Sequence, residues 1–531
     1  MRTRRRAEKV TAAVADLWSH RLAFALRGSG QEAFASYLVK QRWFSAKGRR
    51  LTGVRLLDYV LLPEQPHPTF LALVGVEFDQ APSEIYTVPM FVQPQKRSTR
   101  ASTAKASAPM LVLEGAGLTA TVHDGMDAPL ACAALLDGIR NQTQWKSKAG
   151  TVTCAHTAAG APHLPVTGRQ IQRSKAEQSN TSIIYDRRLI LKLIRKLGSG
   201  VNPDFEVIEF LTTRTAFRHI PLLVGHIQYE GSLAFFGSST FSSTIGVLQQ
   251  FVPNEGDGWS YTLQYLDALL ARARATQDLP TEFIHQMRRL GEITGGLHVA
   301  LASDASRPGF SPEPVTLETI SDWRHDTERL IHTVMSELRA TSYPILSSLG
   351  LGADDIERLE ARSLESLADL TLLLKRPVDR IRIHGDYHLG QVLKTETDFV
   401  ILDFEGEPAR LLAERRKKAC PLKDVAGMLR SFNYAAHVAL QNERSGLQRS
   451  QAVAKAWEAA VTRSFLEGYF AEARPGEVRF LPASREDAMR VARVFQLEKA
   501  IYELHYELQN RPDWIAIPLH GLRELLSTGV N

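Results

Sequence analysis

Along the chain, segments that alternate apolar and polar residues give way to longer segments with apolar residues three or four positions apart. Alternation is typical of half-buried strands, and the longer spacing is typical of amphipathic helices. The first pattern dominates residues 51–92 and 171–252, and the second dominates from residue 260 onward. The pattern therefore predicts an α+β protein in which a strand-rich half precedes a helical half.

The strand-rich half contains one strong local pattern, "TSIIYDRRLILKLIRKL". Two alternating runs flank Asp186 and Arg187, which predicts a β-hairpin turning at that pair. A helix is expected directly after it, with Asn202 as its cap and Pro203 at its first position. Two further strands are expected, in "SLAFFG" at 232–237 and in "TIGVLQQFV" at 244–252.

Before the hairpin the pattern is more varied. Residues 8–40 and 128–139 are predicted as helices, with strands at 51–92 and on both sides of residue 115. The Ser, Thr, Ala and Lys bias of 93–109 predicts a long exposed loop. Residues 140–170, rich in Gly, Ala and Thr, are predicted to be irregular.

The helical half is predicted to contain only two strands, both within 381–403. Helices are expected at 260–276, 280–303, 316–338, 353–375, 423–441, 450–471 and 484–510. A β-rich part followed by a helical part is the layout of a two-lobed kinase. The expected division is an N-terminal cap subdomain at 1–92, an intermediate β-rich subdomain with a flexible loop at 93–170, the remaining N-lobe at 171–252 and a helical C-lobe at 253–531.

Composition narrows the class of protein only slightly. The 531 residues carry a net charge of +6, and the basic segments lack interleaved aromatics, so we expect no nucleic-acid partner. No apolar run has the length of a membrane span, and the basic start leads into a mixed helix rather than a signal sequence, so we expect a cytoplasmic protein without a membrane partner. Three scattered cysteines predict neither disulfides nor a zinc site.

The chemistry is concentrated in "HGDYHLGQVL" and in "DFEGEP", which follows it. Asp386 precedes the amide residue Gln391 by five positions, and Asp403 comes seventeen positions after Asp386. Protein kinases place a catalytic Asp, a metal-binding amide and a metal-binding Asp in this order. Asp386 as a simple turn residue is the alternative, but the spacing to the other two argues against it.

Upstream, Lys192 lies at the centre of a predicted strand, on the opposite face from Leu191 and Leu193. An ammonium in that position suits nucleotide phosphates. Glu206 on the next helix is its expected partner, although Glu209 fits almost as well. The neighbouring Arg195 and Lys196 are interpreted as surface residues.

Two histidines in the first motif are open to more than one interpretation. His384 and His388 are either hydrogen-bonding residues of the loop or part of a transition-metal site, for which no third ligand stands out. Substrate candidates are a second open question. Glu405 lies beside the expected metal site, and Glu498 and Tyr502 share a helix face with His505.

Several longer segments together resemble the bacterial maltokinases associated with trehalose synthase. They include "QRWFSAKGR", "EQSNTSIIY", "HGDYHLGQVL", "DFEGEP" and "LEKAIYELHYELQNRPDW", and the similarity extends from about residue 35 to 525. The resemblance implies an aminoglycoside-phosphotransferase-like, two-lobed protein-kinase-like fold behind an N-terminal cap. It also implies ATP- and Mg²⁺-dependent phosphorylation of maltose to maltose 1-phosphate, which feeds α-glucan synthesis, and trehalose synthase as a partner.

The same resemblance implies roles for individual residues. Asp386 is the catalytic base, and Gln391 and Asp403 are the Mg²⁺ ligands. The ATP site is implied to consist of Lys192, Glu206, Ser179, Asn180, Thr181 and the main chain near Gln250 and Val252. The substrate site is assigned to His384, Glu405, Glu498 and Tyr502.

Two alternatives remain beside maltose phosphorylation. One is a kinase for another small substrate, such as glucosamine or an aminoglycoside. The other is a non-catalytic scaffold that binds trehalose synthase, with Trp43 and Phe44 of the cap as a docking surface. The intact set of Lys192, Asp386 and Asp403 argues against the scaffold.

Overall fold

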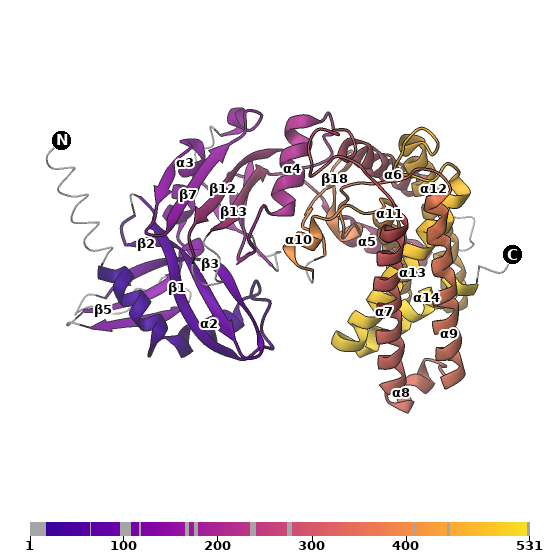
Figure 1. Cartoon of the computed structure of the whole chain (residues 1–531), viewed down its shortest axis with the longest axis horizontal. Coiled ribbons are helices and arrows are strands. Elements are labelled where there is room, and N and C mark those ends of the chain that lie inside the picture. Colours follow the sequence, from indigo (N-terminus) through magenta and orange to yellow (C-terminus); the bar gives the residue numbers. More distant parts are fainter. Residues whose placement is uncertain are drawn as a thin grey trace. The chain divides into compact units, whose positions relative to one another are not determined.

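The computed structural model falls into two units, which are described separately (Figure 1). Unit 1 comprises residues up to Thr213 together with Pro221–Val252, and unit 2 comprises Arg214–Ile220 together with Pro253–Asn531. The described residues are 17–63, 65–95, 108–115, 118–164, 169–174, 179–233, 240–272, 279–407, 410–442 and 447–527. The expected loop at 93–109 lies mostly outside them.

The N-terminal part of unit 1 is a sheet covered by helices at 17–27 and at α2 (Gln31–Lys40). Its strands pair in the order β1-β2-β3-β5-β4, and the short β11 also pairs with β3. The strands are β1 (Leu51–Leu61), β2 (Thr69–Phe78), β3 (Ala81–Pro94), β4 (Leu111–Gly115), β5 (Leu118–Asp124) and β11 (Lys196–Leu197). Trp43 and Phe44 are buried in this core, where Phe44 packs against Tyr86 with ring centroids 5.2 Å apart. Both aromatics are therefore structural and do not form an exposed docking surface.

The second sheet of unit 1 pairs in the order β6-β7-β12-β13-β10-β9-β8 among the described residues. Its strands are β6 (Gln144–Lys146), β7 (Gly150–His156), β8 (Ile171–Arg173), β9 (Thr181–Tyr185), β10 (Leu189–Leu193), β12 (Leu223–Gly231) and β13 (Phe241–Gln250). Helix α3 (Pro129–Arg140) confirms the helix predicted at 128–139. Helix α4 (Pro203–Arg214) confirms the helix predicted directly after the hairpin. The strands β9, β10 and β13 of this sheet thus lie where the alternation predicted them.

The hairpin β9–β10 turns at Asp186 and Arg187, as predicted. Both residues have positive φ, 51° and 53°, a turn geometry that matches the right-handed twist of the flanking strands, and Tyr185 pairs with Leu189 across the turn. The cap of α4 is confirmed as well, because the Asn202 Oδ1 accepts the backbone N–H groups of Asp204 at 2.8 Å and Phe205 at 3.2 Å. The start of α4 is therefore defined by local sequence.

Replacing Asn202 by Ala removes this acceptor and leaves two N–H groups of the first turn unsatisfied. We expect the free energy of unfolding to fall by about 1 kcal/mol, the usual cost of a lost N-cap. Urea denaturation of the full chain measures the change, and Asn202→Ser is the matched control because its hydroxyl can still accept. Equal stability of the Ala variant and the wild type would mean that the cap contributes nothing.

Arg195 is wrongly predicted as a surface residue. Its side chain is 0% exposed, and it donates to Asp124 at 2.9 Å and to the Thr181 hydroxyl at 2.8 Å. The indole of Trp43 covers its guanidinium at 4.7 Å. Lys196, by contrast, is exposed as expected. Alternation ends at Leu193, so the direction of Arg195 depends on the packing of the two sheets of unit 1 and not on strand periodicity.

Two other predictions for unit 1 are corrected. Residues 140–170 are not wholly irregular, because β6 and β7 lie there. In β7 the inward residues are Val152 and Cys154 between threonines and an alanine, a contrast too weak to reveal a strand from composition. The strand before β13 is β12 at 223–231, earlier than the predicted 232–237, and residues 234–239 of that segment lie outside the described part.

Unit 2 is mainly helical (Figure 1). Its α-helices are α5 (Gly258–Arg272), α6 (Thr281–Leu301), α7 (Leu317–Ala340), α8 (Tyr343–Ser348), α9 (Ala353–Ser366), α10 (Leu412–Arg415), α11 (Leu422–Asn442), α12 (Leu447–Ala473), α13 (Arg485–Asn510) and α14 (Ala516–Ser527). All seven predicted helices are confirmed in outline, with a 3₁₀ turn at Leu367–Leu374 ending the fourth. The helices α8, α10 and α14 were not predicted. No helix within the described ranges is long and apolar enough to cross a membrane.

The strands of unit 2 differ from prediction. A small sheet pairs β14 (Gly256–Asp257), β17 (Val392–Lys394) and β18 (Phe399–Ile401), and β15 (Glu313–Pro314) pairs with β16 (Asp379–Arg380). Residues 381–383 form no strand, although their apolar character suggested one. Ile381 makes a single bridge to Ala419, and the backbone after it hydrogen-bonds to a buried side chain instead of a neighbouring strand.

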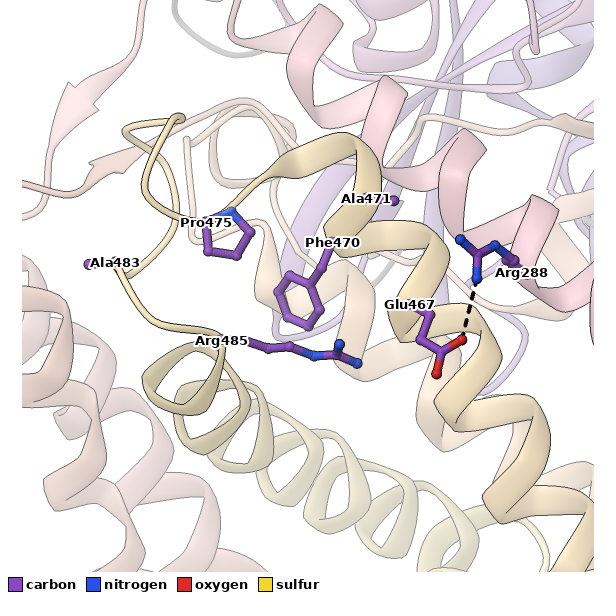
Figure 2. Close-up of a pocket in the computed structure, with 7 residues that line it drawn as sticks. All are labelled: Arg288, Glu467, Phe470, Ala471, Pro475, Ala483 and Arg485. Atoms are coloured by element: carbon purple, nitrogen blue, oxygen red, sulfur yellow. Dashed lines mark hydrogen bonds and ion pairs between the residues drawn. The ribbon is translucent and has the colours of Figure 1, made fainter.

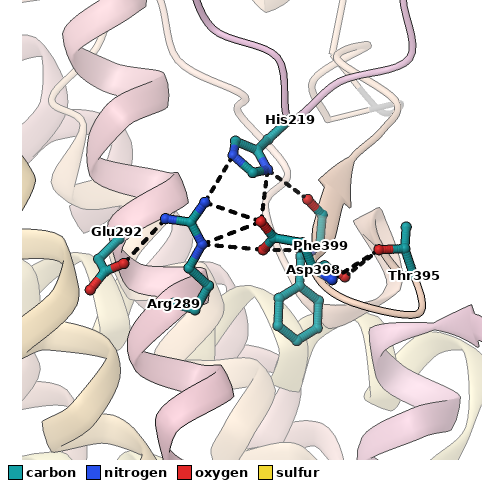
Figure 3. A network of polar contacts seen from close by, with 6 residues as sticks. All are labelled: His219, Arg289, Glu292, Thr395, Asp398 and Phe399. Carbon is teal, nitrogen blue, oxygen red and sulfur yellow. Dashed lines mark hydrogen bonds and ion pairs between the residues drawn. The ribbon is translucent and has the colours of Figure 1, made fainter.

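A network of hydrogen bonds and ion pairs connects the β17–β18 hairpin to α6 and to His219 (Figure 3). Asp398 in its turn receives the Arg289 guanidinium of α6 at 3.1 Å, and the His219 Nδ1 lies 3.0 Å from the Phe399 carbonyl. The Ile401 N–H also donates to the His219 carbonyl at 2.8 Å. The short segment 214–220 of unit 2 and α6 thereby hold the strand that leads directly to Asp403.

Candidate functional site

The loop that carries Asp386 is anchored to α11 through a buried carboxylate. Asp424 accepts the backbone N–H of His384 at 2.8 Å, that of Gly385 at 2.9 Å and the His298 Nε2 at 3.1 Å. Burial opposes ionisation, but the His298 hydrogen bond and the other donors outweigh it and hold the pKa of Asp424 below its usual value. Gly385 has a φ of +85°, a conformation that glycine adopts without strain. The backbone before Asp386 is therefore rigidly positioned.

Asp386 is partly buried and is paired with a lysine from α13. The Lys499 Nζ donates to its Oδ1 at 3.1 Å, and the Lys499 ammonium also lies 5.0 Å from the Tyr502 ring. Burial lowers the pKa of Lys499, but the neighbouring carboxylates, first of all Asp386, outweigh burial and raise it. Lys499 is thus a permanent cation beside the predicted base, and no spacing in the sequence pointed to it.

The two histidines of the loop have different surroundings. His384 is buried. Its Nδ1 accepts the Asp386 N–H at 3.3 Å, and its Nε2–H donates to the Leu402 carbonyl at 2.8 Å. Both ring nitrogens are occupied, which favours a positioning role over contact with substrate. His388 accepts the Gly390 N–H at Nδ1, and its Nε2 lies 3.9 Å from Asp386. Burial lowers the pKa of His388, so this imidazole is neutral near pH 7.

Gln391 and Asp403 are brought together as the motif predicted. The Gln391 Nε2 donates to the Asp403 Oδ2 at 3.4 Å, and the Leu402 N–H donates to the Gln391 carbonyl at 2.9 Å. Asp403 has a φ of +65°, an unfavourable conformation for a residue with a Cβ. Amide and carboxylate oxygens are the donors that Mg²⁺ prefers, so this pair would fit such an ion with the Gln391 amide turned to present its oxygen instead of its Nε2.

In unit 1, Lys192 lies on β10, where buried and half-buried side chains alternate as predicted. Lys192 is half-buried, and its neighbours Leu191 and Leu193 are buried. Its ammonium forms an ion pair with Asp204 at 3.3 Å, and both side chains are largely buried. Asp204 is in the first turn of α4, one position after the predicted Pro203, and was not singled out from sequence. The bracing role predicted for Glu206 stays a prediction.

The remaining ATP candidates also lie in unit 1. Ser179 is exposed and Asn180 is buried directly before β9, while the Thr181 hydroxyl accepts from Arg195. The Gln250 N–H donates to the Leu222 carbonyl at 3.0 Å within the sheet. The boundary between the units falls between Val252 and Pro253, directly after the main chain near Gln250 and Val252 that was assigned to the ATP site.

The substrate candidates Glu405, Glu498 and Tyr502 belong to unit 2 together with Asp386. Glu498 accepts from the Lys423 ammonium at 2.9 Å. Burial, followed by the charge of Glu407, raises the pKa of Tyr502 to about 12, so its hydroxyl keeps its proton and remains a donor. Glu407 in "DFEGEP" is a further acidic group of this region, and Arg410 donates to it at 2.6 Å.

A surface groove of about 470 Å³ lies elsewhere on unit 2 (Figure 2). Arg288 of α6 is paired there with Glu467 of α12 at 3.4 Å, and the Arg485 guanidinium lies 5.1 Å from the Phe470 ring. The predicted site residues are not among those that line it. Both cations already have partners, so the groove is not a candidate for the kinase chemistry.

Comparison with known proteins gives three results. Residues 37–126 match the maltokinase N-terminal cap domain family. A glucosamine kinase of Streptacidiphilus jiangxiensis is 25% identical over 372 residues, which are 68% of this chain and 74% of the relative. A glucosamine kinase of Mycolicibacterium smegmatis is 25% identical over 404 residues, 75% of this chain and 88% of the relative.

Among solved structures, a glucosamine kinase in complex with glucosamine, ADP and inorganic phosphate is similar with a TM-score of 0.62 and 20% identity. The match covers 92% of this chain and 96% of the other. It confirms the predicted kinase-like fold, with a β-rich N-lobe, a helical C-lobe and a cap before them. Together the matches support a maltokinase-like protein, a kinase-like phosphotransferase with an N-terminal cap domain.

Proposed function

We propose that the protein transfers the γ-phosphoryl group of ATP to the anomeric hydroxyl of maltose, releasing ADP and maltose 1-phosphate. The match of residues 37–126 to the maltokinase cap supports maltose. The similar structure that contains ADP supports ATP as the donor. The arrangement of Asp386, Gln391 and Asp403 in unit 2 is what the chemistry of a kinase requires.

In the proposed reaction, Asp386 orients the anomeric hydroxyl and accepts its proton as the sugar oxygen bonds to the γ-phosphorus. The bond between the γ-phosphorus and the bridging oxygen breaks, and the electron pair leaves with ADP. Gln391 and Asp403 would hold Mg²⁺, which neutralises charge on the phosphates when bound. Lys192 is the candidate cation for the nucleotide phosphates, with its ammonium held in place by Asp204.

The choice of a neutral sugar rests on one observation. Around Asp386 and α13, carboxylates are already paired with cations. An amino sugar carries a positive charge and is best bound by carboxylates that lack a cation of their own. Four carboxylates of this region already have one: Asp386 with Lys499, Glu407 with Arg410, Glu498 with Lys423 and Glu503 with Arg430, at 3.1, 2.6, 2.9 and 2.6 Å. The ammonium of Lys499 would also repel an amino group near the base.

A second candidate is phosphorylation of glucosamine, because the curated relatives at 25% identity are glucosamine kinases. The experiment that separates the two measures ADP release with maltose, glucose, glucosamine and kanamycin. We expect the highest kcat/KM with maltose and a product that has lost its reducing end. Turnover of glucosamine without turnover of maltose would reject the proposal.

Lys499→Met tests the charge argument directly, since Met keeps the length of the side chain and removes the ammonium. We expect kcat/KM for maltose to fall by about 10-fold, the scale of one charge-assisted hydrogen bond. We also expect the ratio of glucosamine to maltose turnover to rise. The matched control is Lys375→Met, which removes an exposed lysine paired with Asp487 and should leave both values unchanged. An unchanged ratio in Lys499→Met would contradict repulsion by this ammonium.

The proposal extends to the setting of the reaction, with the product entering α-glucan synthesis in the cytoplasm and trehalose synthase as a partner. Because Trp43 and Phe44 belong to the cap core, a docking surface would have to consist of exposed cap residues such as Phe24, which is 80% exposed. Co-purification with trehalose synthase that survives Asp386→Ala and fails in Phe24→Ser would support a binding role independent of catalysis.

A further inference from the structure

Two histidines and a glutamate from two helices meet on unit 2, and none of the three is assigned to the kinase reaction. His437 belongs to α11, and His520 and Glu524 belong to α14. One potential ligand atom of each residue lies within 4.8 Å of those of the other two. The two imidazole rings are 4.7 Å apart between centroids, at 64° to each other.

The packing of α14 explains why these side chains face one another. His520 and Glu524 are four residues apart, so both project from one face of the helix. Gly521 lies between them in sequence, and a Cβ at that position would come within 2.1 Å of the Arg430 guanidinium. The close approach of α14 to Arg430 thus fixes the rotation of the helix and directs His520 towards α11.

The chemistry of the three groups favours a cation. His437 is half-buried and His520 is exposed, and each offers a ring nitrogen to the cluster. A neutral imidazole can offer a lone pair to a metal, and the carboxylate of Glu524 supplies negative charge. Neutral nitrogen donors with one carboxylate suit Zn²⁺, Co²⁺ or Ni²⁺, whereas Mg²⁺ prefers oxygen donors alone.

The surrounding cations leave room for an added ion. Arg430 is already held by Glu503 at 2.6 Å and by Asn433 at 2.8 Å. Lys455 is 4.0 Å from Glu524, but its side chain is 81% exposed and can turn towards solvent. Zinc needs ligand atoms about 2.0–2.2 Å from the ion, so the three side chains must move inward by roughly an ångström. His520 is exposed and Glu524 is only half-buried, so small rotamer changes at these two residues can supply most of that shift.

We propose that His437, His520 and Glu524 form a binding site for one transition-metal dication of the Zn²⁺ type, which ties the C-terminal helix α14 to α11. Three protein ligands leave one coordination position for water. The bound ion stabilises the folded chain by mass action, because the unfolded chain does not hold the three ligands together. The site is independent of the proposed sugar-kinase activity and of the donors Gln391 and Asp403.

The test uses the full chain without a histidine tag, after removal of metals with EDTA. Co²⁺ is titrated while its visible absorption is followed, and bound Zn²⁺ is counted by elemental analysis after gel filtration in excess Mg²⁺. We expect one Zn²⁺ per chain, intense Co²⁺ bands typical of low coordination number, and a rise of several degrees in Tm with Zn²⁺. His520→Ala is expected to weaken binding at least about 10-fold and to abolish the rise in Tm.

Three further variants make the result specific. Glu524→Gln should also weaken binding, whereas His332→Ala, an exposed histidine paired with Glu360, should not. Asp403→Asn should keep the site, because that variant changes only the donors proposed for Mg²⁺. Absence of a bound ion in the wild type, or Zn²⁺ binding unchanged in both His520→Ala and Glu524→Gln, would overturn the proposal.

Discussion

Asp386→Asn is expected to lower kcat by on the order of 10²-fold or more, while ATP with Mg²⁺ still binds. Asn keeps the shape of the side chain and can still orient a hydroxyl, but it cannot accept the proton. The Lys499 ammonium, 3.1 Å from Asp386, loses its charged partner as well. Steady-state kinetics with maltose and calorimetric titration of Mg²⁺–ATP measure the two effects separately.

Asp403→Asn provides the contrasting result. It removes negative charge from the proposed metal donors, so we expect weaker Mg²⁺ and nucleotide binding together with a lower rate. If Asp386→Asn abolished nucleotide binding and Asp403→Asn left it intact, the two roles would be the reverse of those proposed.

The second large effect is expected from Asp424→Ala, which removes a buried carboxylate from beneath the catalytic loop. The N–H groups of His384 and Gly385 and the ring of His298 would lose their shared acceptor. Removing one partner of a buried charged network costs about 3–5 kcal/mol, so we expect a loss of that order in the free energy of unfolding. Chemical denaturation measures it, and Asp326→Asn at an exposed ion pair is the control, with a change of about 0.5 kcal/mol or less.

Asp424 also links stability to pH. Its pKa in the folded protein is lower than in the unfolded chain, where an Asp titrates near about 3.9. The stabilisation from its ionised form is therefore complete above that value and is lost as the pH falls through the folded pKa. The stability gap between wild type and Asp424→Asn, a variant that keeps the shape, should accordingly be constant near pH 7 and narrow below about pH 4. A gap that stays constant down to pH 3 would contradict an ionised Asp424.

Several parts of the fold were predictable because the signals are local. The turn at Asp186–Arg187, the cap at Asn202 and the half-buried position of Lys192 depend on residues only a few positions apart. The long helices were predicted for the same reason, since apolar spacing defines a buried face. Strand β7 was missed because Thr, Ala and Gly supply little contrast between its two faces, and β6, Gln144–Lys146, is too short to show an alternation.

By itself, the sequence determined the kinase-like order of chemical groups, because Asp386, Gln391 and Asp403 lie within eighteen residues and their spacing is set by one loop and one hairpin. Only the tertiary structure decided which groups surround them. Asp424 follows His384 by 40 positions and Lys499 follows Asp386 by 113, so their contacts depend on how α11 and α13 pack. Arg195 was interpreted as exposed for the same reason: whether a charged side chain is buried depends on the partners that distant segments bring to it, and spacing along the chain does not record them.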